Sequence, residues 1–433
     1  MTLRYRVAFA VVALALAGRR AEAQQPLAEF LAAARHGGST EARVAAAQAA
    51  QARSLRNEAR GRLLPSLLVT AGYTRNQQDV VVTIPSGPTT STRATITPLD
   101  QLDARFSLTL PLLDLAAWSN YFGASSSAEA ARERSNATVL DVTANVVTAY
   151  YAVVESRAVR DSAAAALGTA EENASVVGAR ADAGRASVVD RERANADVAR
   201  AQQTLAEATL QCEQAAESLY VASGVRPTEV RVTLADDLAG EAPLETWTAR
   251  VADLPSVRAA AQDVRAAENA RVAALEGLVP TLAATATERI TNASGFGPAD
   301  LWSVGVSANW SLDFVRPAAV NTRSEELAVA RARADGARRL AESAVLDAWN
   351  RVRSLLVRAR AARAGEEAAT RAAESARARL GAGTGSHLEL SQAERDRFVA
   401  EVTRIQAEAE LIVARLALRV RSGSPDPESW GRR

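Results

Sequence analysis

Two short segments of the sequence carry glycine, serine and an acidic side chain at the same spacing. They are Gly184-Arg185-Ala186-Ser187-x-x-Asp190 and Gly383-Thr384-Gly385-Ser386-x-x-Glu389. Glycine adopts the left-handed conformation that closes a helix. Serine is a good N-cap residue, and an acidic residue three positions later completes a capping box. The chemistry predicted for both segments is hydrogen bonding in a tight turn between two helices, and such a turn would form whatever the protein does.

The sequence is poor in side chains that catalyse reactions or bind metals. Its only cysteine is Cys212, and its two histidines are His36 and His387. A single cysteine excludes an internal disulfide, and the sequence has no Ser-His-Asp order, no cluster of metal ligands and no glycine-rich phosphate loop. We therefore expect no catalytic residue, no metal and no cofactor. Cys212 is expected to pack in a helix seam and His387 to be a solvated turn residue.

The composition favours long helices over a thick globular core. Hydrophobic residues make up 48% of the chain but aromatic residues only 4%, and alanine is abundant. Small side chains allow helices to pack closely along their length. All 51 basic residues are arginine, and the formal net charge is only +1. A nucleic-acid-binding protein would carry a basic excess, so we expect no nucleic-acid partner.

Residues 1–23 have the pattern of a secretory signal peptide. Arg4 and Arg6 precede an apolar run over residues 7–17, and Ala21-Glu22-Ala23 supplies the small residues that a signal peptidase reads, so that Gln24 begins the mature chain. No cysteine follows this site, so a lipid anchor is not indicated. After the leader we expect no run of transmembrane-helix length, and a membrane would have to be crossed by a β-barrel.

The mature chain contains two copies of one plan. Landmarks around the first strand recur in the same order, and so do landmarks around the glycine turn. The first set is Arg43, Arg56, Leu63, Pro65, Leu67 and Ala71, matched by Arg258, Arg271, Leu278, Pro280, Leu282 and Ala286; the second is Arg180, Gly184, Ser187, Asp190 and Ala194, matched by Arg379, Gly383, Ser386, Glu389 and Ala393.

Each copy is predicted to begin with a helix that a proline ends and to continue with a pair of strands. The helices span about 27–63 and 255–278. Apolar and polar residues then alternate over 66–76 and 101–112 in the first copy, with a loop at 77–99, and over 281–290 and 301–314 in the second. Such alternation suits a membrane strand with lipid on one side and water on the other, although a half-buried strand of a soluble sheet shares it.

The remaining sequence predicts long helices paired as coiled coils. Residues 116–181, 187–222, 318–380 and 387–420 contain no proline. Apolar residues follow 4-3 spacing in the second and fourth of these segments, as expected of a coiled-coil seam. The seam residues are Ala194, Val198, Ala201, Leu205, Ala208, Cys212, Ala215 and Leu219 in one, and Phe398, Val402, Ile405, Ala409, Ile412 and Leu416 in the other.

This arrangement resembles the TolC family of outer-membrane efflux and secretion channels over nearly the whole mature chain, roughly residues 27–420. The resemblance rests on the order and repetition of several short motifs. They are Leu64-Pro65 and Val279-Pro280 before the first strand of each copy, Leu110 to Asp114 after the second strand, Ala149-Tyr150-Tyr151 in the long helix, and the two glycine turns.

The resemblance implies a mainly helical fold with a small β part. Four membrane strands from each chain of a homotrimer would form a shared twelve-stranded barrel in outer-membrane lipid, and long antiparallel helices would continue as a periplasmic tunnel. The domains would be a first repeat over 24–224, a linker that contributes to a belt over 225–254, a second repeat over 255–421 and a disordered tail over 422–433. Candidate interfacial aromatics are Tyr73, Tyr121, Phe122, Phe296, Trp302, Trp310 and Phe314.

The resemblance also assigns roles to the glycine turns. They would form a periplasmic tip that meets an adaptor protein, with Gly184, Ser187, Gly383 and Ser386 as candidate contacts and Asp190 and Glu389 as candidate gate or lumen charges. Gln392 and Gly385 depart from the acidic and basic residues expected at those positions. The implied function is a passive exit duct of a tripartite efflux or type I secretion system, served by an inner-membrane pump of the RND, ABC or MFS type. The alternative is a periplasmic coiled-coil adaptor or scaffold.

Overall fold

The computed structural model describes residues 25–85, 87, 90–228, 234, 236–295 and 297–423, without the side chain of His36. The predicted signal peptide, Phe296 and all of the predicted tail after Gly423 lie outside these residues. The chain forms two compact units, one within residues 1–46, 135–257 and 338–433, and the other within residues 47–134 and 258–337. Each unit therefore combines segments from both predicted repeats.

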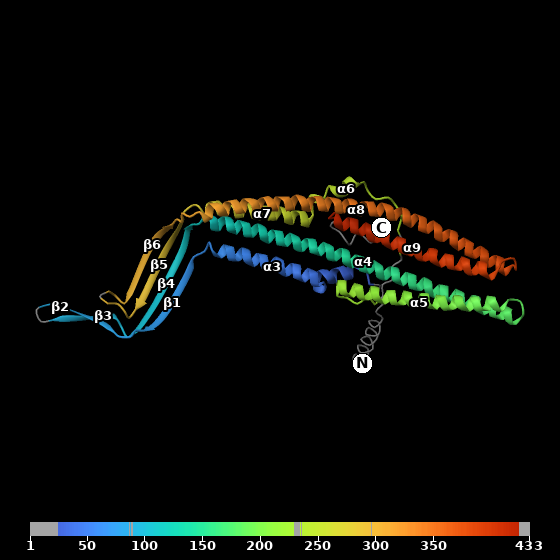
Figure 1. Cartoon of the computed structure of the whole chain (residues 1–433), viewed down its shortest axis with the longest axis horizontal. Coiled ribbons are helices and arrows are strands. Elements are labelled where there is room, and N and C mark those ends of the chain that lie inside the picture. The colour runs from blue at the N-terminus through green and yellow to red at the C-terminus, as the bar shows by residue number, and fades with distance from the viewer. Residues whose placement is uncertain are drawn as a thin grey trace, which may run out of the picture. The chain divides into compact units, whose positions relative to one another are not determined.

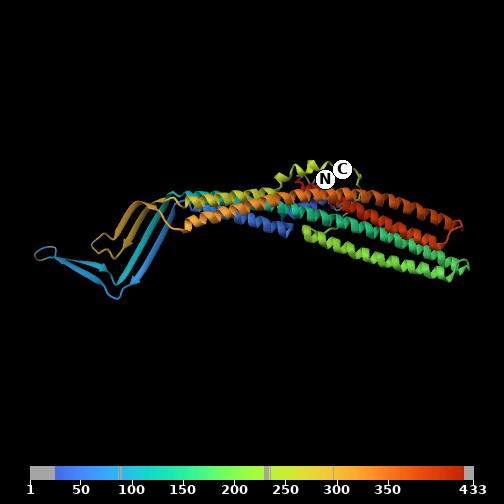
Figure 2. The same cartoon turned by 45° about the horizontal axis from the view of Figure 1, so that its top comes forward.

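The second unit contains a four-stranded antiparallel sheet in the order β1-β4-β5-β6. Its strands are β1 (Ser66–Arg75), β4 (Asp100–Leu113), β5 (Thr281–Thr291) and β6 (Asp300–Asn309). The strand predicted over 301–314 thus ends at Asn309, and Trp310 and Phe314 follow it. Figures 1 and 2 show the four strands side by side in a single layer.

A second hairpin replaces the loop predicted over 77–99. It consists of β2 (Val80–Pro85) and β3 (Ser91–Thr97), which pair antiparallel. The loop prediction was wrong because the prolines and serines of the tip outweighed the strand signal on either side. Three consecutive valines and several threonines favour the extended conformation, since branched side chains fit a pleated surface.

Helices α3 (Thr40–Gly61) and α7 (Pro255–Glu276) lead into β1 and β5. The single helix predicted over 27–63 is broken into α2 (Leu27–Ala33), a π-helical turn η1 (Ala34–Gly38) and α3. The break has a steric reason, because a Cβ added to Gly38 would lie 2.1 Å from the carbonyl oxygen of Ser223. After the break, Ser39 caps α3 by accepting a hydrogen bond from the amide of Ala42.

Four long helices make up most of the remaining chain. They are α4 (Leu115–Asp182), α5 (Val188–Ser223), α8 (Val315–Gly381) and α9 (His387–Arg421). The 68 residues of α4 extend about 100 Å at the usual helical rise. Every predicted seam residue of α5 and α9 is buried or half-buried, and Cys212 is a buried, packed thiol as expected.

One stretch of α4 is apolar enough to meet a simple test for a membrane-spanning helix, with a mean hydropathy of 1.4 over 18 residues. This corrects the expectation that no such run follows the leader. However, Val142, Val146, Tyr150 and Val153 of α4 are buried against α2, α5 and α9. The apolar stretch therefore serves as one side of a protein core.

A second core of the first unit joins α8 and α9 to the linker. Val345, Val352, Leu411 and Leu418 are buried there together with Val251 and Leu254, which flank the short turn η2 (Val251–Asp253). The linker also contains the short helix α6 (Leu244–Thr248). The indole nitrogens of Trp247 and Trp349 both donate to the carbonyl oxygen of Ala242. Apolar packing and indole hydrogen bonds thus hold the linker on the helix pair.

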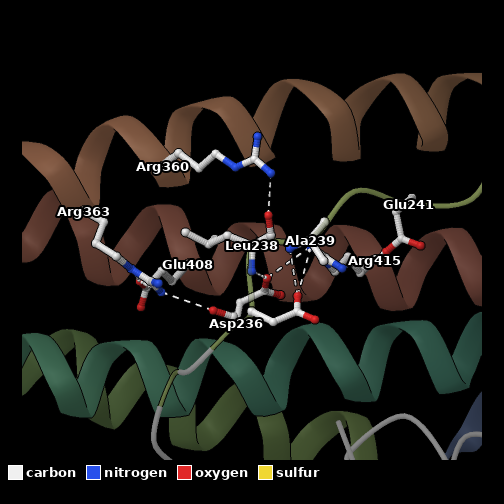
Figure 3. Close-up of polar contacts among 9 residues, drawn as sticks. Asp236, Leu238, Ala239, Glu241, Arg360, Arg363, Glu408 and Arg415 are labelled. Carbon is white, nitrogen blue, oxygen red and sulfur yellow. Dashed lines mark hydrogen bonds and ion pairs between the residues drawn. The ribbon is translucent and has the colours of Figure 1, made fainter.

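A buried ion-pair cluster fastens the linker more tightly, as Figure 3 shows. The Arg415 guanidinium lies 3.1 Å from the Asp236 carboxylate and 3.0 Å from the Glu241 carboxylate. These side chains are only 11%, 8% and 10% exposed. Arg415 also donates to the carbonyl oxygen of Ala239, and Arg360 donates to that of Leu238. We call Arg415, Asp236 and Glu241 the linker clasp.

The linker clasp holds a strained backbone. Leu238 has a φ of 53°, which is unfavourable for a residue with a side chain. Its amide donates to the Asp236 carboxylate at 2.7 Å. Nearby, Arg363 of α8 pairs at 2.6 Å with Glu408 of α9, which is 1% exposed, and donates to the carbonyl oxygen of Asp236. Since strain of this kind persists only where surrounding contacts determine it, the cluster fixes one path for the linker.

We expect Arg415→Ala to destabilise the protein by about 3–5 kcal/mol, because it removes the guanidinium that pairs with two buried carboxylates. Arg358→Ala is the matched control on the same helix pair, since its 2.7 Å ion pair with Glu410 is half exposed and should contribute less than about 1 kcal/mol. Thermal unfolding followed by circular dichroism compares the two. Equal midpoints for both variants would contradict the stabilising role of the linker clasp.

Candidate functional site

The strand register gathers apolar side chains on one face of the sheet. Residues directly opposite in an antiparallel pair point to the same side, so the pairings align one apolar set across all four strands. This apolar face consists of Leu67, Val69, Ala71 and Tyr73 of β1, Leu102, Ala104, Phe106, Leu108 and Leu110 of β4, Leu282, Ala284, Ala286 and Ile290 of β5, and Trp302, Val304, Val306 and Ala308 of β6.

The opposite face is mainly polar. On this face Ser107, Thr287 and Ser303 lie opposite one another on β4, β5 and β6. Next to them Arg105 of β4 lies opposite Arg289 of β5. Arg289 forms an ion pair of 2.6 Å with Asp103 across β4 and β5. Glu288 interrupts the apolar face, between Phe106 and Trp302, close to the end of the sheet that carries the β5–β6 connection. The alternation seen in the sequence thus becomes two chemically distinct surfaces.

Among the described residues, the outer strands of the sheet are exposed on both faces. All residues of β1 and β6 are exposed, including Val304 and Val306 of the apolar face. In the described part of the chain, β1 pairs only with β4 and β6 only with β5, so both outer strands have one unpaired edge. An exposed apolar face and two open edges are a liability in water, and they mark this sheet as a surface built for other surroundings.

The predicted aromatic residues surround the sheet. Trp302 lies on the apolar face and is 76% exposed, and Tyr73 donates from its hydroxyl to Asp100. Beyond the opposite end of β6, the indole of Trp310 donates to the carbonyl oxygen of Leu278, and Phe314 is 96% exposed. At the start of α4, Tyr121 and Phe122 pack with Trp118, which sequence reasoning missed although it sits one helical turn before them. Aromatic side chains therefore flank both ends of the apolar face.

The first glycine turn joins α4 to α5 and has the geometry that the sequence predicts. Gly184 has a φ of 71°, and Ser187 and Asp190 form a complete capping box. Hydrogen bonds from the Ser187 hydroxyl and its backbone amide hold the pKa of Asp190 below its usual range, and the positive charge of Arg193 acts in the same direction. Asp190 is therefore a fixed negative charge at neutral pH.

The second glycine turn joins α8 to α9 and departs from the prediction in one contact. Gly383 has a φ of 76°, and Ser386 accepts a hydrogen bond from the amide of Glu389. The Glu389 carboxylate does not complete the capping box; it lies 3.6 Å from the guanidinium of Arg379 on the preceding helix. The longer glutamate side chain reaches across the turn, so here the acidic residue links the two helices of the hairpin.

The two turns lie at the same end of the first unit (Figures 1 and 2), and one polar contact joins their hairpins a little further along. The Ser391 hydroxyl of α9 donates to the Asp197 carboxylate of α5 at 2.5 Å. Asp197 also pairs with Arg200 on its own helix. Neither residue stood out in the sequence, because a serine and an aspartate on charged helix faces carry no recognisable motif.

Among the described residues, no group of three or more histidine, cysteine, aspartate or glutamate side chains could hold a metal ion. Cys212 and His387 also lie far apart in the sequence, on α5 and at the start of α9. The features described in this subsection are surfaces and charges.

The family model for "Outer membrane efflux protein" matches residues 38–225 and 251–424. The two matched segments fall on either side of residues 226–250, within the predicted linker. No curated protein sequence matches the chain.

Solved structures share the fold over nearly the whole chain. A membrane protein from Pseudomonas aeruginosa is 21% identical, with 92% of this chain and 93% of that one covered and a TM-score of 0.76. The CmeC outer membrane channel of Campylobacter jejuni is 16% identical, with 92% and 85% covered and a TM-score of 0.77. The MtrE outer membrane channel of Neisseria gonorrhoeae, solved in its open state, is 20% identical, with 92% and 88% covered and a TM-score of 0.74.

The family match covers most of the chain, and the solved structures share its fold over 92% of its length. These findings, together with the exposed apolar face, favour an outer-membrane location over the alternative of a periplasmic adaptor or scaffold. The chain belongs to the outer membrane efflux protein family and is an outer-membrane channel protein of efflux systems.

Proposed function

We propose that three copies of this chain close their sheets into one twelve-stranded barrel in the outer membrane. The observation that carries the proposal is the sheet itself, with one apolar face exposed and the outer edges of β1 and β6 unpaired. Hydrocarbon cannot satisfy open backbone groups, so strands that enter a membrane must pair all round. In the closed barrel β6 of one copy would pair with β1 of the next, and the apolar face would contact lipid.

The aromatic side chains fit this placement. Tyr73 and Trp302 would lie near the outer surface of the membrane, and Trp310, Phe314 and Trp118 near the periplasmic surface, where amphipathic rings are favoured. The polar face with Arg105, Asp103 and Arg289 would line the water-filled lumen. In this arrangement Glu288 would lie towards the outer headgroups, the zone where a carboxylate costs least.

We infer that the long helices extend the barrel into a periplasmic tunnel that acts as a passive exit duct. Such a duct needs no catalytic residue or cofactor. Energy and selection of cargo would come from an inner-membrane pump of the RND, ABC or MFS type, in a tripartite efflux or type I secretion system, and an adaptor would bridge the pump to the channel. The match to the efflux family supports this division of work.

The glycine turns are proposed as the adaptor-contacting tip, with Gly184, Ser187, Gly383 and Ser386 exposed or half-exposed around it. Asp190 and Glu389 are proposed as gate or lumen charges, so that a ring of acidic residues from three copies would favour cations. Opening of the tip would separate the two hairpins of each chain. The Ser391–Asp197 hydrogen bond would then be one of the contacts that opening breaks.

The oligomeric mass tests the proposal most directly. Protein extracted from outer membranes in mild detergent should have the mass of three chains by light scattering, each 45.6 kDa before loss of the leader. It should also resist extraction without detergent. A monomer or dimer that is soluble in water would overturn the shared barrel.

A charge on the apolar face should impair insertion. Val304→Arg places a guanidinium where lipid is proposed, at a cost of about 2–4 kcal/mol per copy, and should lower the amount of channel in the outer membrane. Ser303→Arg, on the adjacent residue of the polar face, is the matched control and should insert normally. The amount of heat-modifiable trimer in isolated outer membranes gives the comparison, and equal levels of both variants would argue against the assigned faces.

Bulk at the glycine turns should abolish export without unfolding the protein. At both Gly184 and Gly383 a Cβ would meet no atom within 4 Å, so Gly184→Trp with Gly383→Trp incurs only backbone strain, about 1–2 kcal/mol at each site. Gly168→Trp with Gly365→Trp, also in open space but within helices, is the control. Export is measured as drug susceptibility of cells that depend on the channel. Full export by the turn variant would count against the tip assignment.

A further inference from the structure

The two hairpins of the first unit line a partly open cavity that the exit-duct role does not use. Helices α4, α5 and α9 surround about 300 Å³ of space between the glycine turns and the middle of the hairpins. This volume is at the lower end of the range of small-molecule sites. The cavity is formed within one copy of the chain.

The cavity exists because the helix seams are too small to fill it. Ala163, Ala166 and Ala170 line it from one face of α4, and the seam residues Ala194 and Ala201 line it from α5. Further along the same seam two leucines, Leu205 and Leu219, alternate with the smaller Ala208, Cys212 and Ala215. Alanine methyl groups of α4 and α5 leave a gap beside Phe398 and Val399 of α9. Well-packed interiors do not tolerate gaps without an occupant or a cost in free energy.

Polar atoms without partners lie at both ends of the cavity. The Ser162 hydroxyl lines it from α4, in a residue only 7% exposed, and has no hydrogen-bond partner among the described residues. At the other end both ring nitrogens of His387 are shielded from solvent and likewise lack a partner in the described part of the chain. Buried polar atoms are normally satisfied, so each of these groups points to a hydrogen bond that a bound molecule would supply.

The charges around the cavity balance one another. Asp197 is held by Ser391 and Arg200, and Glu394 is paired with Arg377 and Arg397. The wall contains three arginines and three carboxylates in all, Arg200, Arg395, Arg397, Asp197, Glu394 and Glu401, so it presents no net charge from these groups for a charged ligand to neutralise. The complementary molecule is therefore neutral, mostly apolar and able to hydrogen-bond at its ends. Seven residues separate Ala163 from Ala170, which gives an apolar length of about 10 Å.

We propose that this cavity is a binding site for a neutral amphipathic molecule of two or three aromatic rings, held between the two hairpins of one chain. Such a ligand contacts α4, α5 and α9 together. It therefore binds the arrangement in which the hairpins are close and stabilises that arrangement relative to any in which they separate. The site is distinct from the lumen charges and from the turns that are proposed to meet an adaptor.

N-phenyl-1-naphthylamine is a suitable probe, because it is neutral, fits the volume and fluoresces strongly in apolar surroundings. The full-length channel is reconstituted in lipid nanodiscs and titrated, with empty nanodiscs as the blank. We expect a saturable component above the blank. Ala166→Leu and Ala201→Leu, which fill the cavity, should each abolish it, whereas Ala164→Leu, at an exposed position two residues after Ser162, should leave it unchanged.

Ser162→Ala separates a ligand contact from a structural role. The hydroxyl has no hydrogen-bond partner among the described residues, so its removal should leave the thermal midpoint unchanged or raise it. Binding is measured with 1-naphthol, an analogue that has a hydrogen-bonding terminus. Its dissociation constant should rise about three- to ten-fold in the variant. Absence of a saturable component, or equal binding by the filled variants, would overturn the proposal and leave water or a neighbouring copy as the occupant. Loss of the trimer would instead count against the proposed function.

Discussion

The backbone hydrogen bonds at the two outer edges of the sheet are the constraint on which the rest of the structure depends. Strands β1 and β6 each leave one row of amide and carbonyl groups unpaired, and the apolar face between them is exposed. Unpaired backbone groups beside an exposed apolar face must find hydrogen-bond partners outside this sheet. In the proposed trimer, the long helices, the linker and the turns would be the parts that bring three such sheets to the same place and hold them in register.

The helical part achieves its rigidity with unusually small apolar side chains, and charges make up for the missing bulk. Where the seam contains leucine, valine and Tyr150, the helices bury an ordinary core. Where the linker crosses α8 and α9, arginine reaches carboxylates and carbonyl oxygens at once. Guanidinium groups suit this task because several fixed N–H donors can satisfy several acceptors.

Much of the fold could be predicted from the sequence because the relevant signals are local. Proline-free segments predicted α4, α5, α8 and α9, with 4-3 spacing in α5 and α9, and alternation predicted the four strands of the sheet. The positive φ of Gly184 and Gly383 followed from the turn chemistry. The failures arose where tertiary contacts decide, since the break at Gly38 depends on Ser223, far along the chain, and the β2–β3 hairpin was hidden by the composition of its tip.

The candidate site was less predictable, for the same reason. The Ser391–Asp197 contact and the linker clasp join residues that are remote in sequence and unremarkable in type. Glu389 was expected to cap its own helix, and only the structure shows its side chain turned to Arg379. The alanines that line the cavity come from α4 and α5, and in the sequence they are indistinguishable from the many other alanines of these helices.

Every lysine or arginine position of the chain is arginine, and this determines how its ion pairs respond to the pH outside the cell. In each ion pair described here, from the linker clasp to Asp103–Arg289, only the carboxylate can change its charge within the range that bacteria meet, because a guanidinium stays protonated above pH 12. A periplasm that shares the acidity of its surroundings exposes these pairs directly. The ion pairs described here therefore respond to pH in one direction only: alkali leaves them intact, and only acid can break them.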